Sequence, residues 1–497
     1  MRKIQKILVA NRGEIALRIM RTAREMGIKT VAVFSDIDRQ ALHVRYADEA
    51  IGIGPAPSSE SYLRMDKIIE AAKLAGADAI HPGYGFLSEN EDFAQLAIDN
   101  GIIFIGPSPK AIEIMGSKLA AKAAVSKFKV PLVPGTSEPI TDLKAAKEVA
   151  KSIGYPILIK ASAGGGGKGM RIVESEEQFN EQMERAASEA KSAFGDGSVF
   201  IEKYIAKPRH IEFQILGDQH GNVVHLFERE CSIQRRHQKV IEEAPSSVLT
   251  PDKRKLMGEA AINVARSCNY YNAGTVEFIL DEKLDFYFLE MNTRLQVEHP
   301  VTEQITGLDL VKLQILIAQG EQIPFKQEDL KINGHAVEAR VYAEDPSNNF
   351  LPDIGTLRTY TRPQGPGVRV DDGLEKGMEI PFYYDPMIAK LICHADTRSA
   401  AIEKMLRAID EYDITGLETT LGFCRFVMKH DAFRSGNFDT RFVENFFSAS
   451  DLNPPSNDDE EKIAAALAAV LQFNDKSVKR ENHTASATAK WKKSRLK

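Results

Sequence analysis

The chain has 497 residues, of which 43% are hydrophobic, and a formal net charge of −6. This length allows several buried cores and, at roughly 100 to 200 residues per domain, predicts about three domains, while the small net charge argues against a body built to bind nucleic acid. The four cysteines lie far apart without a Cys-x-x-Cys pair, and no apolar run approaches the roughly 18 residues of a membrane helix, so we expect a cytoplasmic protein without disulfides or membrane spans.

The first 115 residues alternate between strand-like and helical patterns. Strands are predicted at 7–10, 30–34, 79–81 and 102–105, and helices at 14–26, 66–75 and 91–100. Repeated strand-helix-strand units are typical of parallel sheets with helical crossovers. The pattern therefore predicts an open parallel sheet of the Rossmann-like α/β class over residues 1–115.

The segment from 116 to 330 changes in character. Helices are predicted at 117–127 and 142–152 and a strand at 156–160, after which 211–226 and 274–289 are rich in β-forming residues, with turns at 217–221 and 281–283. This pattern predicts a large antiparallel sheet of the α+β class.

Residues 331–447 contain short predicted strands and a helix at 399–409, which indicates a third domain of mixed α+β type. The compact pattern ends near Phe447. The remainder, 448–497, has an acidic run at 458–461, an alanine-rich helix predicted at 462–471 and a basic end. We expect it to be a flexible tail, with docking to a partner chain as the alternative.

Five glycines surround Lys168 directly after the strand predicted at 156–160. Glycine lets the backbone approach phosphate oxygens closely, and a lysine neutralises them, so the segment fits a nucleotide lid. A flexible linker is the competing interpretation. The loop lacks the Gly-Lys-Ser or Gly-Lys-Thr of a Walker sequence opening a helix.

The strand predicted around 288–296 places a row of polar side chains on one face, because side chains alternate along a strand. The row consists of Glu290, Asn292, Arg294 and Gln296. A carboxylate and an amide two residues apart suit Mg²⁺ with ATP phosphates, and Glu277 on another strand is a candidate second carboxylate. A solvated outer face would give the same pattern.

A dense run of charge occupies 228–243. An exposed charged loop is the ordinary interpretation of such a run. The alternative is that Lys239 and Arg294 form a pocket for a small anion, with Glu298 as a general base. Sequence spacing alone does not bring these residues together.

Several long motifs follow one another in the order of a known family. They are Asn-Arg-Gly-Glu-Ile-Ala from 11, His-Pro-Gly-Tyr-Gly-Phe-Leu-Ser-Glu-Asn from 81, the glycine loop, Pro-Arg-His-Ile-Glu from 208, Gln-Arg-Arg-His-Gln-Lys from 234 and Glu-Met-Asn-Thr-Arg-Leu-Gln-Val-Glu-His-Pro from 290. On these motifs the chain, from residue 4 to about 447, resembles the biotin carboxylases. The resemblance implies an N-terminal parallel-sheet domain, an ATP-grasp domain over 116–330 with a mobile lid at about 134–204, and a C-terminal domain over 331–447.

The resemblance also implies roles for individual residues. ATP would be held by Lys118, Lys160, Gly165, Gly166, Gly167, Lys168, Glu202, Lys203, Ile205, His210, Gln234 and His237. Two Mg²⁺ or Mn²⁺ ions would be bound by Glu277, Glu290 and Asn292, and bicarbonate by Lys239, Arg294, Gln296 and Val297. Glu298 would deprotonate bicarbonate, Tyr84 and Arg340 would contact biotin, and Arg340 would stabilise the biotin enolate. Without the resemblance, Tyr84 and Arg340 read as ordinary turn and surface residues.

The reaction so implied is ATP-dependent carboxylation of biotin through carboxyphosphate, the first half-reaction of an acyl-CoA carboxylase, as in fatty acid biosynthesis, or of a pyruvate carboxylase. No Met-Lys-Met attachment sequence occurs, so we expect the biotin carboxyl carrier protein and the carboxyltransferase on separate chains, and a homodimer of this chain. Two rivals remain: another ATP-grasp ligase of the carbamoyl-phosphate synthetase type, and a non-catalytic scaffold that retains the fold.

Overall fold

A computed structural model describes residues 3–136, 138–161, 170–194, 197–236 and 238–452, together with 463, 466 and 467. Within these residues the N-terminal segment forms a parallel sheet in the order β3-β2-β1-β4-β5, as the alternating pattern predicted. Its strands are β1 (Lys6–Val9), β2 (Lys29–Ser35), β3 (Glu49–Gly54), β4 (Ala79–His81) and β5 (Ile103–Phe104).

The helices that accompany this N-terminal sheet begin and end within about one residue of the predicted ranges. They are α1 (Gly13–Glu25), α3 (Met65–Ala75) and α4 (Glu91–Asp99), followed by α5 (Pro109–Gly116). The short α2 (Leu42–Tyr46) and strand β3 were not predicted. Strand β3 reads Glu-Ala-Ile-Gly-Ile-Gly, and its glycines obscure a strand pattern.

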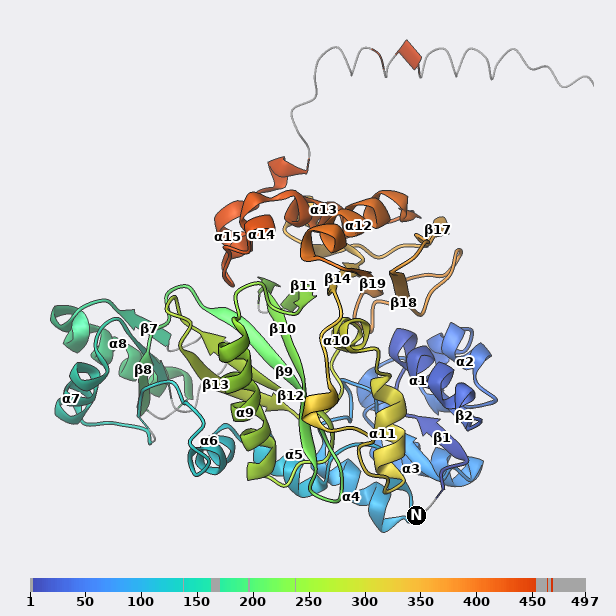
Figure 1. The fold of residues 1–497 in the computed structure, drawn as a ribbon, viewed down its shortest axis with the longest axis horizontal. Coiled ribbons are helices and arrows are strands. Elements are labelled where there is room, and N and C mark those ends of the chain that lie inside the picture. Colours follow the sequence, from blue (N-terminus) through green and yellow to red (C-terminus); the bar gives the residue numbers. More distant parts are fainter. Residues whose placement is uncertain are drawn as a thin grey trace, which may run out of the picture. The chain divides into compact units, whose positions relative to one another are not determined.

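The described residues place a second, antiparallel sheet of eight strands in the middle of the chain, here called the large sheet. Its order is β13-β12-β9-β10-β11-β14-β19-β18 (Figure 1). The strands are β9 (Arg209–Gly217), β10 (Val223–Arg235), β11 (Gln238–Ala244), β12 (Asn272–Leu280), β13 (Phe286–Asn292), β14 (His335–Tyr342), β18 (Val368–Asp372) and β19 (Met387–Ala395). Turns join β9 to β10 and β12 to β13 at the two predicted positions.

Pairing of β11 with β14 joins strands from the segments 116–330 and 331–447 into this one sheet. Helix α9 (Pro251–Ser267) packs on β9 and β10, and α12 (Arg398–Glu411) packs on β14 and β19. The apolar cores follow this arrangement: one contains Val337, Leu391 and Met405, and another contains Phe213, Val264 and Phe278. The strand register puts Ile211 and Val337 on the same face, so α9 and α12 cover one face of the large sheet, and polar side chains such as Glu212 lie on the other.

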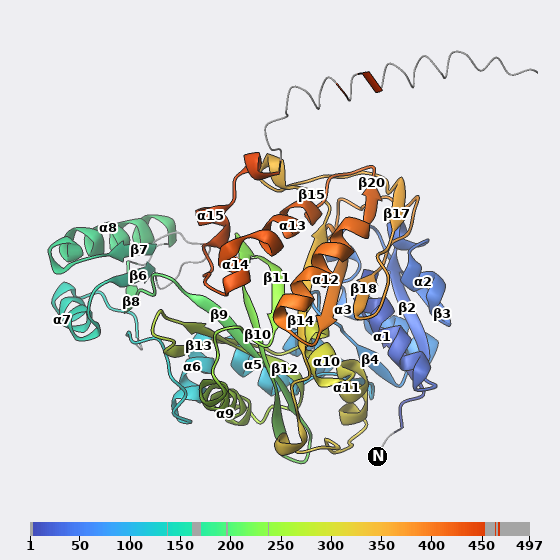
Figure 2. The ribbon, with the colours of Figure 1, turned by 45° about the horizontal axis from the view of Figure 1, so that its top comes forward.

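A smaller sheet, β7-β6-β8, stands apart from the large sheet with its own two helices (Figures 1 and 2). Its elements are α7 (Leu143–Ile153), β6 (Ile157–Ala161), β7 (Met170–Val173), α8 (Glu176–Phe194) and β8 (Val199–Lys203). Ile157, Phe179 and Ile201 belong to its separate core. The predicted glycine loop, with Gly165, Gly166, Gly167 and Lys168, lies outside the described residues.

The other described elements are short connections and helices between the sheets. They are α6 (Lys118–Ser126), α10 (His299–Thr306), α11 (Leu310–Ala318), α13 (Leu421–Lys429), α14 (Asp431–Ser435), α15 (Phe442–Phe446), β15 (Glu344–Asp345), β16 (Leu351–Pro352), β17 (Thr359–Thr361), β20 (Asp413–Thr415) and the 3₁₀ turns η1 (Asp36–Asp38), η2 (Ser58–Glu60), η3 (Gln327–Asp329), η4 (Pro346–Asn348) and η5 (Ala449–Asp451).

Residues 1–447 form one compact unit and 448–497 a second. Most of the helix predicted at 462–471 lies outside the described residues. All four cysteines are described, and each is buried and unpaired, as the spacing predicted. Across the described part of the chain, none of the helices combines the length and the apolar character needed to cross a bilayer.

Candidate functional site

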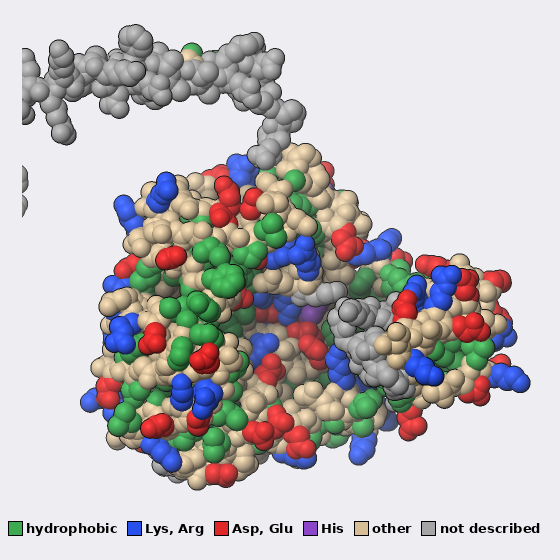
Figure 3. Space-filling view, turned by 180° about the vertical axis from the view of Figure 1, so that it is seen from behind, with side chains coloured by type: hydrophobic (Ala, Val, Ile, Leu, Met, Phe, Trp, Pro, Cys, Tyr) green, Lys and Arg blue, Asp and Glu red, His purple; other side chains and the backbone are tan. Residues whose placement is uncertain are grey.

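Charged side chains gather on one face of the large sheet, in a hollow beside the smaller sheet (Figure 3). Alternation along the strands puts Glu212 and Gln214 of β9, Lys239 of β11 and Glu277 of β12 on this face. The loop that follows β13 adds Arg294, Gln296 and Glu298. Glu212 and Glu298 are almost completely buried, so their charges need partners.

Lys239 is the cation at the centre of this cluster. Its Nζ donates to Glu212 Oε2 at 2.6 Å, to Glu277 Oε1 at 3.0 Å and to Glu298 Oε1 at 2.8 Å. Burial alone would lower the pKa of Lys239, but the three carboxylates raise that pKa well above its usual value. Lys239 is therefore a fixed positive charge that holds carboxylates from three parts of the chain.

Glu298 bridges two cations. Its Oε1 accepts from Lys239, and its Oε2 accepts from Arg340 Nη2 at 3.0 Å. Burial would raise the pKa of Glu298, but Lys239, Arg340 and Arg229 hold that pKa well below its usual range. The structure thus brings together Lys239, Glu298 and Arg340, which sequence spacing could not do.

Beneath this cluster lies Arg229, which the sequence analysis gave no role. It is completely buried and donates to Glu212 Oε1, Gln214, Thr302, Thr275 and Gln296. Gln296 in turn donates to Glu277 Oε1 at 2.9 Å. Glu212 was also missed, because a charged residue in a strand-like run reads as part of a solvated face.

The two carboxylates predicted to bind metal, Glu277 and Glu290, lie directly opposite each other on β12 and β13. Asn292 donates to Glu277 Oε1 at 2.9 Å. Burial and the charge of Glu277 raise the pKa of Glu290, with Lys118 among the groups that oppose the increase. Two carboxylates that repel each other beside an amide oxygen form a site that suits a hard divalent cation.

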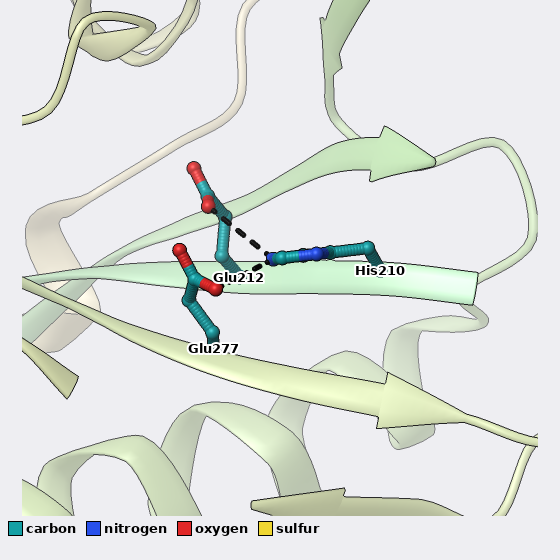
Figure 4. Close-up of side chains that lie close together, drawn as sticks. All are labelled: His210, Glu212 and Glu277. Carbon is teal, nitrogen blue, oxygen red and sulfur yellow. Dashed lines mark ion pairs between the residues drawn. The ribbon is translucent and has the colours of Figure 1, made fainter. Parts of the chain in front are cut away.

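His210 joins the same group from β9. Its Nε2 lies 2.9 Å from Glu277 Oε2 and 3.8 Å from Glu212 Oε2 (Figure 4). Its Nδ1 faces the side-chain amide of Gln234 at 3.0 Å. The donor atoms of His210, Glu212 and Glu277 lie close enough together to hold one metal ion.

Arg294 follows β13 and contacts one of the metal candidates, Asn292. Its Nε donates to Glu89 Oε2 at 2.8 Å and its Nη2 to Asn292 Oδ1 at 3.1 Å. Glu89 also accepts from the backbone N–H of Thr293, so it fixes the start of the loop. Glu89 was not singled out in the sequence, although it belongs to the motif that begins at residue 81.

A cavity of about 460 Å³ opens between the N-terminal sheet and the large sheet. Tyr84, Arg294, Val297 and Arg340, which the sequence analysis assigned to substrate, all line it. The Tyr84 hydroxyl donates to Glu14, and the buried Lys390 donates to the Val297 carbonyl at 2.9 Å. The cavity therefore joins the Lys239–Glu298–Arg340 cluster to a space large enough for a small organic ring.

The residues predicted to hold nucleotide are spread more widely. Lys160 Nζ donates to Glu202 Oε2 at 2.5 Å, and Lys122, which was not predicted, donates to Glu202 Oε1 at 2.8 Å. Lys203 lies 3.5 Å from the Tyr287 hydroxyl at the β12–β13 hairpin. Ile205 follows β8, Lys118 begins α6, and His237 lies outside the described residues.

Comparison with known proteins places this geometry in a family. Residues 3–112 match the model of the biotin carboxylase N-terminal domain, and residues 338–445 match that of the biotin carboxylase C-terminal domain. Residues 117–326 between them match the model described as the carbamoyl-phosphate synthase L chain ATP-binding domain.

Two relatives show how far the similarity extends. The chain is 53% identical to the biotin carboxylase of Nostoc sp., over 89% of this chain and 99% of that protein. It is 51% identical to the mitochondrial methylcrotonoyl-CoA carboxylase subunit alpha of Rattus norvegicus, over 97% of this chain, and spans about two thirds (67%) of that longer protein.

A solved biotin carboxylase structure has the same fold as this chain. The biotin carboxylase domain dimer of the Hydrogenobacter thermophilus 2-oxoglutarate carboxylase, in complex with magnesium ADP, ADP and bicarbonate, superposes with a TM-score of 0.82 at 50% identity, covering 92% of this chain and 100% of that one. With three consecutive domain models matched and this identity over most of its length, the chain belongs to the biotin carboxylase family of ATP-dependent ligases.

Proposed function

We propose that this protein uses ATP and bicarbonate to carboxylate biotin on a separate biotin carboxyl carrier protein, by way of carboxyphosphate. The observation that carries the proposal is the chain of contacts Lys239–Glu298–Arg340, which lies between the carboxylate pair Glu277–Glu290 and the cavity lined by Tyr84. A phosphoryl group bound at Glu277 and Glu290 and a biotin ring in the cavity would come together beside Lys239, Glu298 and Arg340.

Glu277, Glu290 and Asn292 would hold Mg²⁺ or Mn²⁺, with His210 and Glu212 close by. Their fit to a cation rests on the position of Glu277 opposite Glu290, where burial and the charge of Glu277 raise the pKa of Glu290. A divalent ion there would bridge ATP phosphate oxygens and neutralise their charge. The complex of the Hydrogenobacter domain with magnesium ADP and bicarbonate supports this choice of ligands.

Glu298 is proposed as the base that takes the proton of bicarbonate. Its low pKa shows that Lys239 and Arg340 stabilise its anionic form strongly, which makes it a weak base as it stands. A bicarbonate anion bound by Lys239, Arg294, Gln296 and the loop at Val297 would compete for these cations. Losing their contact would raise the pKa of Glu298 toward a useful value.

The bonds then change in a balanced order. A bicarbonate oxygen forms a bond to the γ-phosphorus as the bond to the ADP oxygen breaks, giving carboxyphosphate. Carboxyphosphate splits into CO₂ and phosphate, and the phosphate takes the proton from the biotin ureido nitrogen. That nitrogen attacks CO₂, while Arg340 stabilises the enolate oxygen.

Residues of the lid and of the segments beside it complete the nucleotide site in this proposal. Lys118, Lys160 and the loop at Gly165, Gly166, Gly167 and Lys168 would contact the ATP phosphates. Glu202, Lys203, Ile205, Gln234 and His237 would line the rest of the pocket. Closure of the lid over 134–204 would keep water away from carboxyphosphate.

The same proposal includes domain boundaries at about 115 and 330 and a cytoplasmic location. So do a homodimer, a separate carboxyltransferase and a separate biotin carboxyl carrier protein belong to it. Propionyl-CoA, acetyl-CoA and pyruvate are the candidate final acceptors.

A carbamoyl-phosphate synthetase activity is the second candidate, because residues 117–326 match a domain model named for that enzyme. The cavity argues for biotin: it is built by Tyr84 from the N-terminal segment and by Arg340 from β14, both outside that match.

ATP hydrolysis by the purified chain tests the proposal. With Mg²⁺ present, we expect ADP release that depends on bicarbonate and rises with free biotin, and we expect Arg294→Ala to lower it at least tenfold. Arg425→Ala, which removes an exposed ion pair with Asp410, is the matched control and should leave the rate unchanged. Turnover indifferent to bicarbonate and biotin would contradict the proposal and favour another ATP-grasp substrate.

A further inference from the structure

Two buried glutamates beside Arg340 have no part in the reaction proposed above. Glu242 of β11 and Glu338 of β14 lie opposite each other in the register of the large sheet, and both are completely buried. Residues opposite each other on antiparallel strands have Cβ atoms about 4.5–5.5 Å apart. The two carboxyl groups are therefore buried neighbours whose charges act on each other.

Their hydrogen bonding is unequal. Glu242 Oε1 accepts from Arg340 Nε at 2.6 Å. Glu242 Oε2 and both oxygens of Glu338 lack a hydrogen-bond partner among the described residues. An ionised carboxylate without a donor is costly to bury, whereas a protonated carboxyl group costs much less.

The charged groups that act most strongly on Glu338 are Lys390 of β19, Glu242 of β11, Arg340 of β14 and Glu298 of the turn before α10. Lys390 is already engaged by the Val297 carbonyl at 2.9 Å and by Glu14 at 3.3 Å. Burial raises the pKa of Glu338 well above its usual value, and burial raises the pKa of Glu242 to about 7 although Arg340 opposes the increase.

We propose that Glu242 and Glu338 share one proton and act as a pair that positions Arg340 for biotin. This inference rests on the proposed function, in which Arg340 stabilises the biotin enolate. Glu242 orients the guanidinium through Nε and leaves Nη2 on the side of Glu298. One negative charge in the pair suffices for this, whereas a second would offset the charge that Arg340 offers to an enolate oxygen.

Substitutions at Glu338 and Glu242 test the shared proton and the positioning of Arg340 separately. Glu338→Gln imitates a protonated carboxyl group, so we expect biotin-stimulated ATP hydrolysis within twofold of the wild type. Glu338→Leu cannot hydrogen-bond to Glu242, and we expect kcat to fall at least fivefold. Glu242→Gln removes the anionic partner of Arg340 and should lower kcat at least tenfold, with KM for ATP within threefold of the wild type as a sign of an intact nucleotide site.

Glu243→Gln is the matched control, because the neighbouring Glu243 is bonded to His335 and Arg398 instead of Arg340. It should keep the wild-type kcat for biotin-stimulated ATP hydrolysis, although removing the charge of a buried ion pair lowers the stability of the fold. Activity lost equally in Glu338→Gln and Glu338→Leu would overturn the proposal, since the site would then need a charge at 338. Full activity in Glu242→Gln, or in Glu338→Leu, would overturn it as well.

An infrared difference spectrum of wild type minus Glu338→Gln reads the charge state directly and needs no turnover. We expect it to show the C=O stretch of one protonated carboxyl group at pH 7, and its absence would overturn the shared proton. A wild-type chain without biotin-stimulated hydrolysis would instead contradict the proposed function, and with it the role assigned to the pair.

Discussion

Lys239 meets Glu212, Glu277 and Glu298 at a position almost removed from water. Each of these carboxylates comes from a different element, so one ammonium group links β9, β12 and the loop before α10. In a buried cluster of this kind, removing one partner leaves an unpaired charge. The free-energy cost of that unpaired charge exceeds the stabilisation that the original ion pair provided.

Lys239→Met should therefore destabilise the fold by about 3–5 kcal/mol in the absence of divalent metal. Urea unfolding in the presence of a chelator measures the loss. Arg425→Ala, at an exposed ion pair, should cost no more than about 1 kcal/mol. A Lys239→Met variant as stable as Arg425→Ala would mean that the three carboxylates do not depend on the lysine.

A metal ion should relieve the repulsion between Glu277 and Glu290, which face each other across two strands. Glu290→Gln removes one charge from the pair and should weaken Mg²⁺ binding at least tenfold. Calorimetric titration of Mg²⁺ into the protein with ADP measures this. Glu282→Gln, in the exposed β12–β13 turn, is the control, and equal affinities in the two variants would argue against a metal at this pair.

At the scale of elements, the N-terminal sheet and its helices could be predicted because each strand-helix unit is local in sequence. The pairing of β11 with β14 could not, since the two strands are about 100 residues apart and β11 lies largely within a run of charge that reads as an exposed loop. Parts of the site could not be recognised from the sequence for the same reason. Glu290 and Asn292 were visible as a polar row, but Glu212 resembles a residue on a solvated strand face, and Arg229 and Glu242 belong to a charge run that reads as an exposed loop, until the large sheet buries all three.

The buried ring of His81 connects the end of β4 to α11. At the end of β4, its Nδ1 accepts from the Gly83 N–H at 3.1 Å and its Nε2 faces Gln314 Oε1 of α11 at 3.2 Å. This arrangement requires the neutral ring, since a proton on Nδ1 would face the Gly83 N–H. Burial accordingly lowers the pKa of His81 to about 3, although Gln314 opposes the shift.

The unfolded chain takes up this proton near pH 6.5, and the folded chain does so only near pH 3, so stability falls as pH drops through that interval. Between pH 7 and pH 4.5, the shifted pKa of His81 should lower the free energy of unfolding by about 2–3 kcal/mol. The free energy of unfolding of His81→Gln should therefore fall less with acidification than that of the wild type. Equal pH slopes would show that His81 is protonated in the folded protein.

At the scale of the whole molecule, residues 1–447 combine three parts with different tasks. The N-terminal sheet contributes Tyr84 to the cavity, the large sheet supplies the charged cluster, and the smaller sheet carries Lys160 and Glu202. Glu298 contacts Lys239, which also contacts Glu277, and it contacts Arg340, which lines the cavity, so in the proposed reaction this arrangement would provide a path for a one-carbon group from phosphate to biotin. Family membership accounts for the fold, and the contacts of Glu298 and Arg340 account for where transfer would occur.

Oxygen transfer from bicarbonate to phosphate tests this account most directly. When the protein turns over ATP and biotin with ¹⁸O-labelled bicarbonate, the bond between a bicarbonate oxygen and the γ-phosphorus survives the release of CO₂. We expect one bicarbonate oxygen in each phosphate released, measured by mass spectrometry. Phosphate that contains oxygen from solvent instead would contradict carboxyphosphate as the intermediate.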